Sequence, residues 1–248
     1  MKYHPGLLRL ARYSFAPNSL KYCGPERQSQ MRAYVQAKTS DRGLGEMLEQ
    51  FDTLYKYLAM IAYENNIRDP FDTRVVEAYW LGNGLLAKTK YKPLAVALTD
   101  GLELPKKLTP RQLATTLSKL DEAVAHHTFH VLNIFRRTGH LPIAHTLLTM
   151  DSCRISWGRI VGSGQWAVGS KNNEYFVEVK PLVYRQGVLE LGKKIIKSVK
   201  SIGLEPKIGE WVSVHWGCVC EVLSARQLGN LEYYTKLSIM LANRYNAP

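Results

Sequence analysis

The sequence predicts an α+β protein in which an N-terminal all-helical domain is followed by a small OB-like β-barrel and a C-terminal helix. As far as about residue 145, apolar residues recur at spacings of three and four, which is the period of an amphipathic helix. From residue 153, short segments rich in β-branched and aromatic residues are separated by glycines, which is typical of a small barrel or sandwich. We therefore expect a helical domain over residues 1–149 and a barrel domain over residues 150–248.

Three segments of the N-terminal half carry helix signals. Residues 44–62 predict one helix with a single apolar stripe, formed by Leu44, Met47, Leu48, Phe51, Leu54, Tyr55, Leu58 and Ile61. Asp69-Pro70 has the form of an N-cap and a first-turn proline, and it predicts a helix through residue 80. Thr109-Pro-Arg-Gln112 has the form of a capping box, and it predicts a helix through residue 124.

The C-terminal half carries strand signals and a second capping box. Residues 154–157 and 211–216 are rich in β-branched and aromatic side chains and predict strands. Ser224-Ala-Arg-Gln227 predicts the start of a C-terminal helix. Its apolar residues are Leu228, Leu231, Leu237 and Leu241.

The composition narrows the class of protein. With 248 residues, 46% hydrophobic and 22% charged, the chain is neither disordered, collagen-like nor a coiled coil. The formal charge of 33 − 21 = +12 permits an anionic partner without requiring one. Four cysteines without CxxC or zinc-ribbon spacing favour a reduced, cytoplasmic protein. No apolar run reaches the ~18 residues of a spanning helix, so we expect no membrane partner.

The densest group of titratable residues is Ala125-His-His-Thr-Phe-His-Val131. On a helix, His126 and His130 are four residues apart and His127 and His130 three, so either pair can bind a metal on one face. We take His126 and His130 as candidate metal ligands and His127 as a candidate cofactor-binding residue. The alternative is a polar helix end, where histidines interact with the C-terminal dipole.

Tyr22-Cys-Gly-Pro25 predicts a turn that exposes Cys23. A cysteine in a turn, beside Lys21 and ahead of a helix, is expected to have a lowered pKa. Cys23 is therefore a candidate nucleophile, ligand or docking point, and we take Tyr22 and Cys23 as candidate cofactor-binding residues.

Two motifs of the C-terminal half resemble the HypC-type chaperones of nickel–iron hydrogenase maturation. Cys153 is followed five residues later by Gly158, as at the start of those proteins, and residues 209–217 read GEWVSVHWG, similar to their GDYVLVHxG-like strand. The resemblance covers residues 151–243. It implies that Cys153 and His215 bind iron carrying cyanide and carbon monoxide. It also implies partners: a maturation scaffold that supplies the iron and the hydrogenase large subunit that receives it.

The residue types in these motifs suit that chemistry, but each also has an ordinary structural explanation. A thiolate and a neutral imidazole are good donors for iron. Equally, Cys153 could be a small apolar residue at a strand start. Cys218 and Cys220 lie on the same side of one strand, and we expect them to fill the core rather than extend a metal site.

The full chain also looks like a prokaryotic family of unknown function, through the segments YCGP, RVVEAYWLGNGLL, HHTFHV, CRISWGRI and VSVHWG. That resemblance implies that the two domains form one unit. We therefore predict that the histidine cluster lies within ~20 Å of Cys153 and His215, beyond which no direct metal transfer is possible.

Three functions follow from these observations. The first is a metallocentre-assembly protein, a carrier rather than an enzyme, that binds iron. The second is a metal- or haem-dependent enzyme using the histidine cluster, with zinc or haem less expected than iron. The third, least expected, is a basic RNA-binding module built on the barrel. The sequence contains no HExxH, Walker or GxGxxG motif, so zincin, kinase and dehydrogenase functions have no support.

Overall fold

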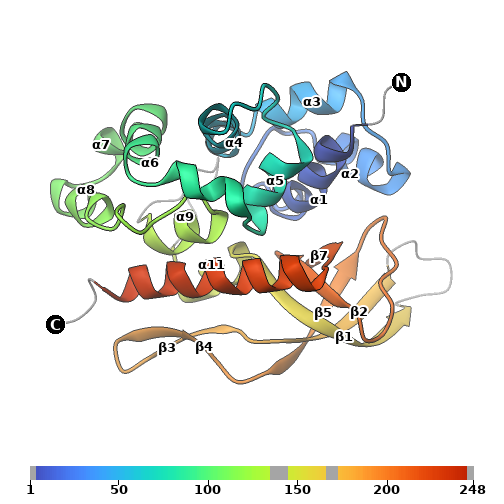
Figure 1. Ribbon diagram of the computed structural model, residues 1–248. Coiled ribbons are helices and arrows are strands. Elements are labelled where there is room, and N and C mark those ends of the chain that lie inside the picture. Colours follow the sequence, from blue (N-terminus) through green and yellow to red (C-terminus); the bar gives the residue numbers. More distant parts are fainter. Residues whose placement is uncertain (1–3, 135–144, 166–172, 245–248) are drawn as a thin grey trace.

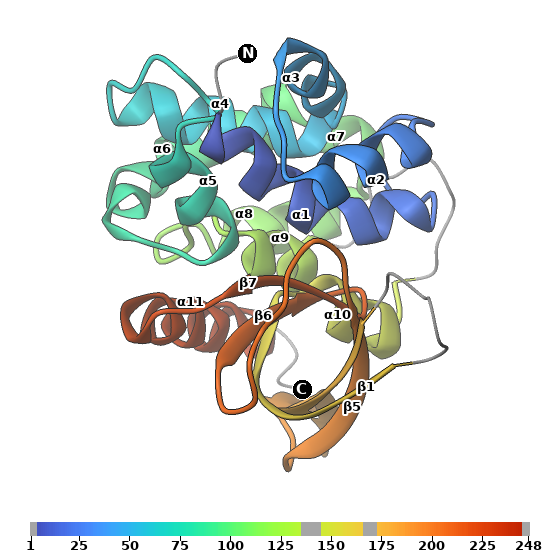
Figure 2. The same cartoon turned by 90° about the vertical axis from the view of Figure 1, so that its right-hand side faces the viewer.

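The computed structural model describes residues 4–134, 145–165 and 173–244 (Figure 1). A layer of helices lies over a β-barrel, and the long C-terminal helix α11 lies beside the barrel (Figures 1 and 2). The predicted α+β class is therefore confirmed. In the described part of the chain, no helix is both long enough and apolar enough to cross a membrane.

The N-terminal layer consists of short helices. They are α1 (Pro5–Ser19), α2 (Gln28–Ala37), α3 (Arg42–Glu49), α4 (Asp52–Glu64), α5 (Thr73–Trp80), η1 (Gly84–Thr89), α6 (Lys92–Val96), η2 (Ala97–Gly101), α7 (Leu104–Lys107), α8 (Pro110–Leu117), α9 (His127–Asn133) and α10 (Leu147–Cys153). Buried apolar side chains of most of these helices form one core cluster.

Three predicted helix bounds need correction. The single helix expected over 44–62 is two helices, α3 and α4, because the chain turns at Gln50 and Phe51 while the apolar side chains keep facing the core. The N-cap of α5 is Asp72, whose carboxylate accepts from the Arg74 N–H, whereas Asp69 accepts from Phe71 in the preceding turn. The capping box at Thr109 is confirmed, but its helix ends at Leu117.

The barrel strands follow the order β1-β2-β5-β7-β6, and β6 pairs with β1 to close the barrel. Their bounds are β1 (Ser156–Gln165), β2 (Asn173–Val179), β5 (Ile195–Ser201), β6 (Trp211–His215) and β7 (Cys218–Val222). All neighbouring pairs are antiparallel except β5 and β7. A hairpin of β3 (Leu182–Arg185) and β4 (Val188–Leu191) extends from the barrel alongside α11 (Ala225–Asn243), which begins at the predicted Ser224 capping box.

The helices and the barrel pack directly against each other, and hydrogen bonds from α1 cross their interface. Arg9 of α1 donates two hydrogen bonds to Glu221 of β7, at 2.9 and 2.7 Å, and one to Glu77 of α5 at 3.1 Å. The Tyr13 hydroxyl lies 2.9 Å from the hydroxyl of Ser213 in β6. The predicted boundary after residue 149 falls within α10, so the helical part and the barrel part of the chain are continuous through this helix.

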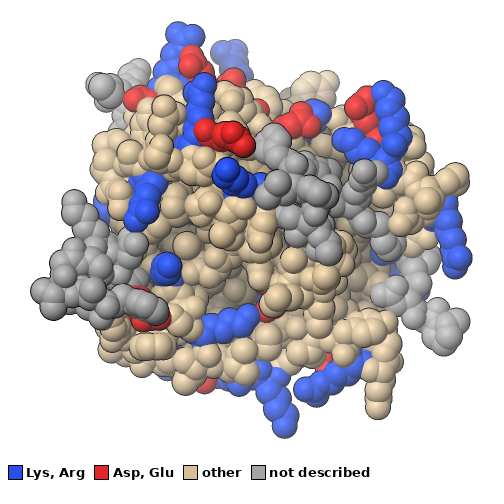
Figure 3. All heavy atoms as spheres, turned by 180° about the vertical axis from the view of Figure 1, so that it is seen from behind, with Lys and Arg blue, Asp and Glu red and all other residues tan. Residues whose placement is uncertain are grey.

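The basic side chains do not gather into one track on the face shown in Figure 3. There, Lys and Arg are scattered among acidic and uncharged residues. Proteins that bind single-stranded nucleic acid use a positively charged groove with stacking aromatic side chains. This face does not present that arrangement.

Candidate metal centre

A cavity of about 140 Å³ lies where the helices meet the barrel. Its wall includes most of the candidate site residues. They are Tyr22, Cys23, His127, His130, Cys153 and His215, joined by His145. Aromatic and aliphatic side chains, among them Phe51, Tyr79 and Trp80, form much of the remaining wall. The predicted proximity of the histidine cluster to Cys153 and His215 is therefore confirmed.

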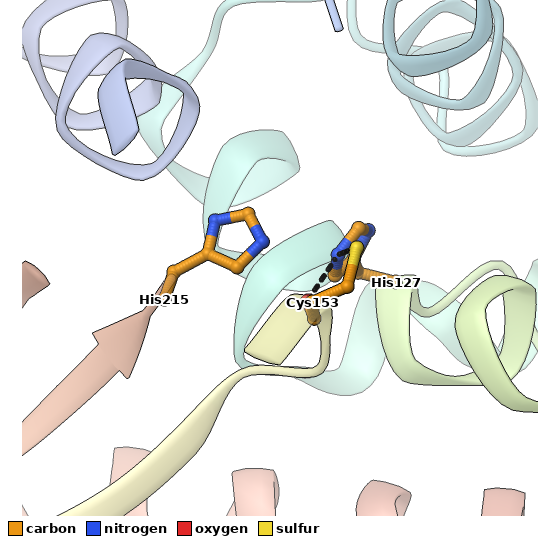
Figure 4. Close-up of side chains that lie close together, drawn as sticks. All are labelled: His127, Cys153 and His215. Atoms are coloured by element: carbon orange, nitrogen blue, oxygen red, sulfur yellow. Dashed lines mark hydrogen bonds between the residues drawn. The ribbon is translucent and has the colours of Figure 1, made fainter. Parts of the chain in front are cut away.

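His127, Cys153 and His215 form the tightest group of potential ligands. One donor atom from each lies within 4.8 Å of the other two, and among the residues that the structure describes no other such group is found. Figure 4 shows His215 at the end of β6 pointing toward Cys153 and His127. The Cys153 Sγ lies 3.8 Å from His127 Nε2, close to the ~3.5 Å between two ligands of one tetrahedral ion.

His215 is held in one tautomer by a backbone carbonyl. Its Nδ1 lies 2.7 Å from the carbonyl oxygen of Tyr13, and a carbonyl only accepts, so Nδ1 carries the proton. In the neutral ring the lone pair is then on Nε2. The ring is 1% exposed. A histidine that donates its other N–H to a carbonyl is the usual arrangement of a metal ligand.

The Tyr13 carbonyl can accept from His215 because of a proline in α1. Four residues after Tyr13 the helix contains Pro17, which has no N–H and cannot make the helical hydrogen bond to that carbonyl. His215 takes the position instead. No helix was predicted over residues 5–19, so this role of Pro17 has no counterpart among the sequence-based predictions.

His127 begins α9 and is anchored through both ring nitrogens. Its Nδ1 lies 3.0 Å from the Tyr79 hydroxyl and its Nε2 lies 2.9 Å from the Cys153 carbonyl. Burial, together with the neighbouring His215 and His130, lowers the pKa of His127 well below its ordinary value. The ring is therefore neutral at pH 7, the form that binds metals. Because a carbonyl only accepts, Nε2 donates to the Cys153 carbonyl in this structure. To bind an ion through Nε2, His127 would give up this hydrogen bond, and its proton would lie on Nδ1 with Tyr79 as the acceptor.

Cys153 is the last residue of α10, not the first residue of a strand as the alternative interpretation held. The strand β1 begins at Ser156. The end of α10 is tied to the end of β6, because the Trp216 N–H donates to the Ser152 carbonyl at 2.9 Å. This contact brings Cys153 and His215 to the same wall of the cavity.

Cys23 and Tyr22 lie in the predicted turn after α1. The side-chain amide of Asn18 donates to the carbonyls of Cys23 and Pro25, at 2.9 and 2.8 Å. The Tyr22 ring packs on Trp216, with centroids 4.5 Å apart. Cys23 is half-buried and packs against the core, so the turn presents it to the cavity rather than to bulk solvent.

His130 reaches the cavity from α9, and His145 from the segment before α10. The His130 Nδ1 lies 3.0 Å from the Tyr57 hydroxyl. His145 was not among the residues predicted to form the site.

His126 does not line the cavity. It is the N-cap of α9, where its Nδ1 accepts from the Thr128 N–H at 3.2 Å, and its ring stacks on Tyr234. His126 and His127 therefore mark the start of the helix, whereas His130 lies in its last turn, as the alternative of a polar helix end held. Because His126 lies one residue before the helix, the predicted four-residue pairing with His130 does not form.

Cys218 and Cys220 also lie outside the cavity wall. Cys220 is fully buried in the core, and burial raises the pKa of Cys218 to about 11. Thiols in this state are inert and act as small apolar groups. Cys220 therefore fills the core as expected, whereas Cys218 is half-buried and belongs to none of the core clusters of the described residues.

Pro17→Ala tests the support of His215. The new N–H competes for the Tyr13 carbonyl, so we expect affinity for a divalent metal to fall about 10-fold, as when other hydrogen-bond partners of ligands are removed. Unfolding free energy is not expected to fall, because a proline inside a helix costs up to about 3 kcal/mol. Cobalt titration and denaturant unfolding measure the two quantities. Pro110→Ala, at the first turn of α8, is the matched control, and equal affinities in both variants would contradict the assignment.

The metal-free protein is expected to lose stability below pH 6.5. Burial lowers the pKa of His126 to about 3, and the pKa of His127 is also lowered, so below pH 6.5 the unfolded chain binds more protons than the folded one. The contribution of these two histidines to the unfolding free energy should be constant above that pH. Below it, each histidine subtracts about 1.4 kcal/mol per pH unit. Urea unfolding between pH 7 and 5 measures the slope, which should be shallower in His126→Asn; identical slopes would rule out this contribution.

The chain belongs to a family described as a family of unknown function, DUF6390, whose model matches residues 2–248. This match spans both halves, as the full-length resemblance implied. No curated protein and no solved structure matches the chain. These comparisons give no support to the resemblance to HypC-type chaperones.

Proposed function

We propose that this member of the DUF6390 family binds one transition-metal ion through His127, Cys153 and His215. The observation that carries the proposal is the convergence of their donor atoms within 4.8 Å in a mostly buried cavity. The three residues are far apart in the sequence and come from α9, α10 and β6. Potential ligands that meet from three separate elements are typical of a binding site. Polar side chains on the exposed face of a single amphipathic helix would not meet in this way.

The residues present fit a metal ion by their chemistry. Two neutral imidazoles and a thiolate suit iron, zinc, copper or nickel. The Nδ1 atoms of both histidines are engaged, one by a carbonyl and one by the Tyr79 hydroxyl, which is how ligands are oriented from outside the coordination sphere. A cavity of about 140 Å³ is small beside the roughly 300–1,000 Å³ of ordinary cofactor pockets, which favours an ion over haem.

We further propose that the ion is iron and that the protein is a metallocentre-assembly factor. What supports this finer proposal is the similarity of two barrel motifs to HypC-type chaperones, together with the position of Cys153 and His215 on one wall of the cavity. A carrier must release its cargo, and a site with three protein ligands allows release more readily than a closed four-ligand site. In this proposal the partners are a maturation scaffold and a hydrogenase large subunit.

The second candidate is a metal-dependent enzyme. One observation favours it: the described residues supply three ligands, as in catalytic zinc sites, which keep a coordination position open to substrate. Cys23 lines the same cavity and is the candidate nucleophile. Thiol-labelling kinetics test that role, since an unperturbed labelling rate at Cys23 would exclude an activated thiolate.

The deciding experiment is anaerobic purification from a host that expresses hydrogenase-maturation proteins, followed by metal analysis and infrared spectroscopy. One iron per chain with cyanide and carbonyl bands would support the carrier. One metal ion per chain without these bands would support the enzyme. A folded protein that binds neither iron nor added cobalt would overturn the proposed metal site.

A further inference from the structure

The cavity wall contains two buried hydrogen-bond donors for which no acceptor lies in the part of the chain that the structure describes. They are the hydroxyl of Ser14 and the indole N–H of Trp80, and these residues are 1% and 3% exposed. Leaving a buried donor unpaired is costly, so such a group in a native protein usually indicates an ion, a water or a ligand that accepts from it. Two of them in one cavity wall therefore point to a ligand that accepts hydrogen bonds.

The Ser14 hydroxyl is not engaged by its own helix. A serine inside a helix commonly donates to a carbonyl of the preceding turn. Ser19 of the same helix α1 does so, because its hydroxyl bonds the Ala16 carbonyl at 2.8 Å. Ser14 makes no such bond to any described residue, although it is buried. Its hydroxyl therefore remains available to a ligand in the cavity.

Both donor residues lie beside the two imidazoles of the proposed metal site. The Trp80 ring centroid is 4.5 Å from that of His127 and 5.4 Å from that of His215. Ser14 directly follows Tyr13, whose carbonyl accepts from His215 and whose ring stacks on Trp80 with centroids 5.1 Å apart. A ligand bound to the metal ion would therefore lie next to Ser14 and Trp80.

The charge and size of the cavity favour a small anion as this ligand. Three protein ligands leave one coordination position open, and one thiolate leaves a divalent ion with a net positive charge. Asp52 is the one acidic side chain among the described wall residues, and it pairs with Lys56 at 2.6 Å on the exposed side. The cavity of about 140 Å³ is larger than the ~30 Å³ that a water takes in the liquid, so an ion and a ligand of few atoms fit together.

We propose that the metal-loaded protein takes up a small anion from solution, which binds the open coordination position and accepts hydrogen bonds from Ser14 and Trp80. The anion replaces water on the ion, no bond within it breaks, and the oxidation state of the metal does not change. This inference rests on the proposed metal site and names the class of ligand that the site takes.

Azide titration of the cobalt(II)-loaded protein tests this ligand site. Visible absorption of cobalt(II) measures azide affinity, and the infrared stretch of bound azide reports its hydrogen bonds. In Ser14→Ala we expect azide affinity to fall about 10-fold and the stretch to shift, because a hydrogen bond to a charged acceptor is lost. Cobalt affinity should be unchanged. Ser19→Ala, on the same helix but outside the cavity wall, is the matched control and should keep the wild-type azide affinity and stretch.

A second variant and the remaining outcomes keep the two proposals separate. Trp80→Phe keeps an aromatic ring but loses the N–H, and it should also bind azide about 10-fold more weakly. Wild-type azide affinity in either folded variant would overturn the ligand site and leave the metal site intact. A cobalt-loaded wild type that binds no azide would overturn it as well, because the two donors would then bind only water. A wild-type protein that binds no cobalt would instead overturn the proposed function itself.

Discussion

Cys153→Ala is expected to abolish tight metal binding while leaving the fold intact. Cys153 supplies the only thiol of the group formed by His127, Cys153 and His215, and its Sγ lies 3.8 Å from His127 Nε2. Loss of a residue that merely hydrogen-bonds a ligand costs about 10–100-fold in affinity, so loss of the thiolate should exceed 100-fold. Equilibrium titration with cobalt(II) measures the affinity, and the thiolate charge-transfer absorption should disappear.

The control for this experiment is Cys218→Ala. Cys218 is half-buried like Cys153 but lies outside the cavity wall. It should bind cobalt with wild-type affinity and an unchanged spectrum. If Cys153→Ala keeps the thiolate absorption while Cys23→Ala loses it, the thiol ligand is Cys23, and the group of His127, Cys153 and His215 is not the metal site.

Arg9→Met is expected to destabilise the protein by about 3–5 kcal/mol. The Arg9 side chain is buried between the helices and the barrel, where it bonds both carboxylate oxygens of Glu221 and one of Glu77. Its removal leaves the largely buried Glu221 carboxylate without the Arg9 guanidinium, while Glu77 keeps its ion pair with Arg226. Breaking one partner of a buried ion pair costs this amount. Chemical denaturation at pH 7 measures the loss.

Arg74→Met is the matched control for that substitution. Arg74 also bonds a carboxylate, Asp72, at 2.8 Å, but it is exposed, and exposed ion pairs contribute little. Its unfolding midpoint should stay near that of the wild type. A midpoint shift in Arg9→Met no larger than in Arg74→Met would show that the contact between the two halves does not stabilise the fold.

Capping boxes and apolar spacing predicted much of the fold, because both depend only on residues that are close together in the sequence. A capping box needs four residues, so Thr109 and Ser224 marked helix starts correctly. Apolar spacing reports which side chains face the core, but not whether the backbone continues as one helix. That is why residues 44–62, which keep one apolar stripe across the turn at Phe51, were predicted as a single helix.

The sequence identified most residues of the candidate site, but it was less successful in predicting which of them lie together. His127, His130, Cys153, His215, Cys23 and Tyr22 all line the cavity, but His126 does not, because it caps α9. A shift of one residue in the start of a helix changes which side chains share a face. The sequence pattern HHTFH is compatible with a helix that begins at His126 and with one that begins at His127.

Patterns along the chain were enough to predict the α+β class, the order of helices before barrel, several helix starts and the residue types capable of binding a metal. No such pattern predicts that His127, Cys153 and His215 meet, because their contact depends on how α9, α10 and β6 pack. The tertiary structure also decided the role of Pro17. A missing N–H in α1 becomes a support for His215 only once β6 lies against that helix.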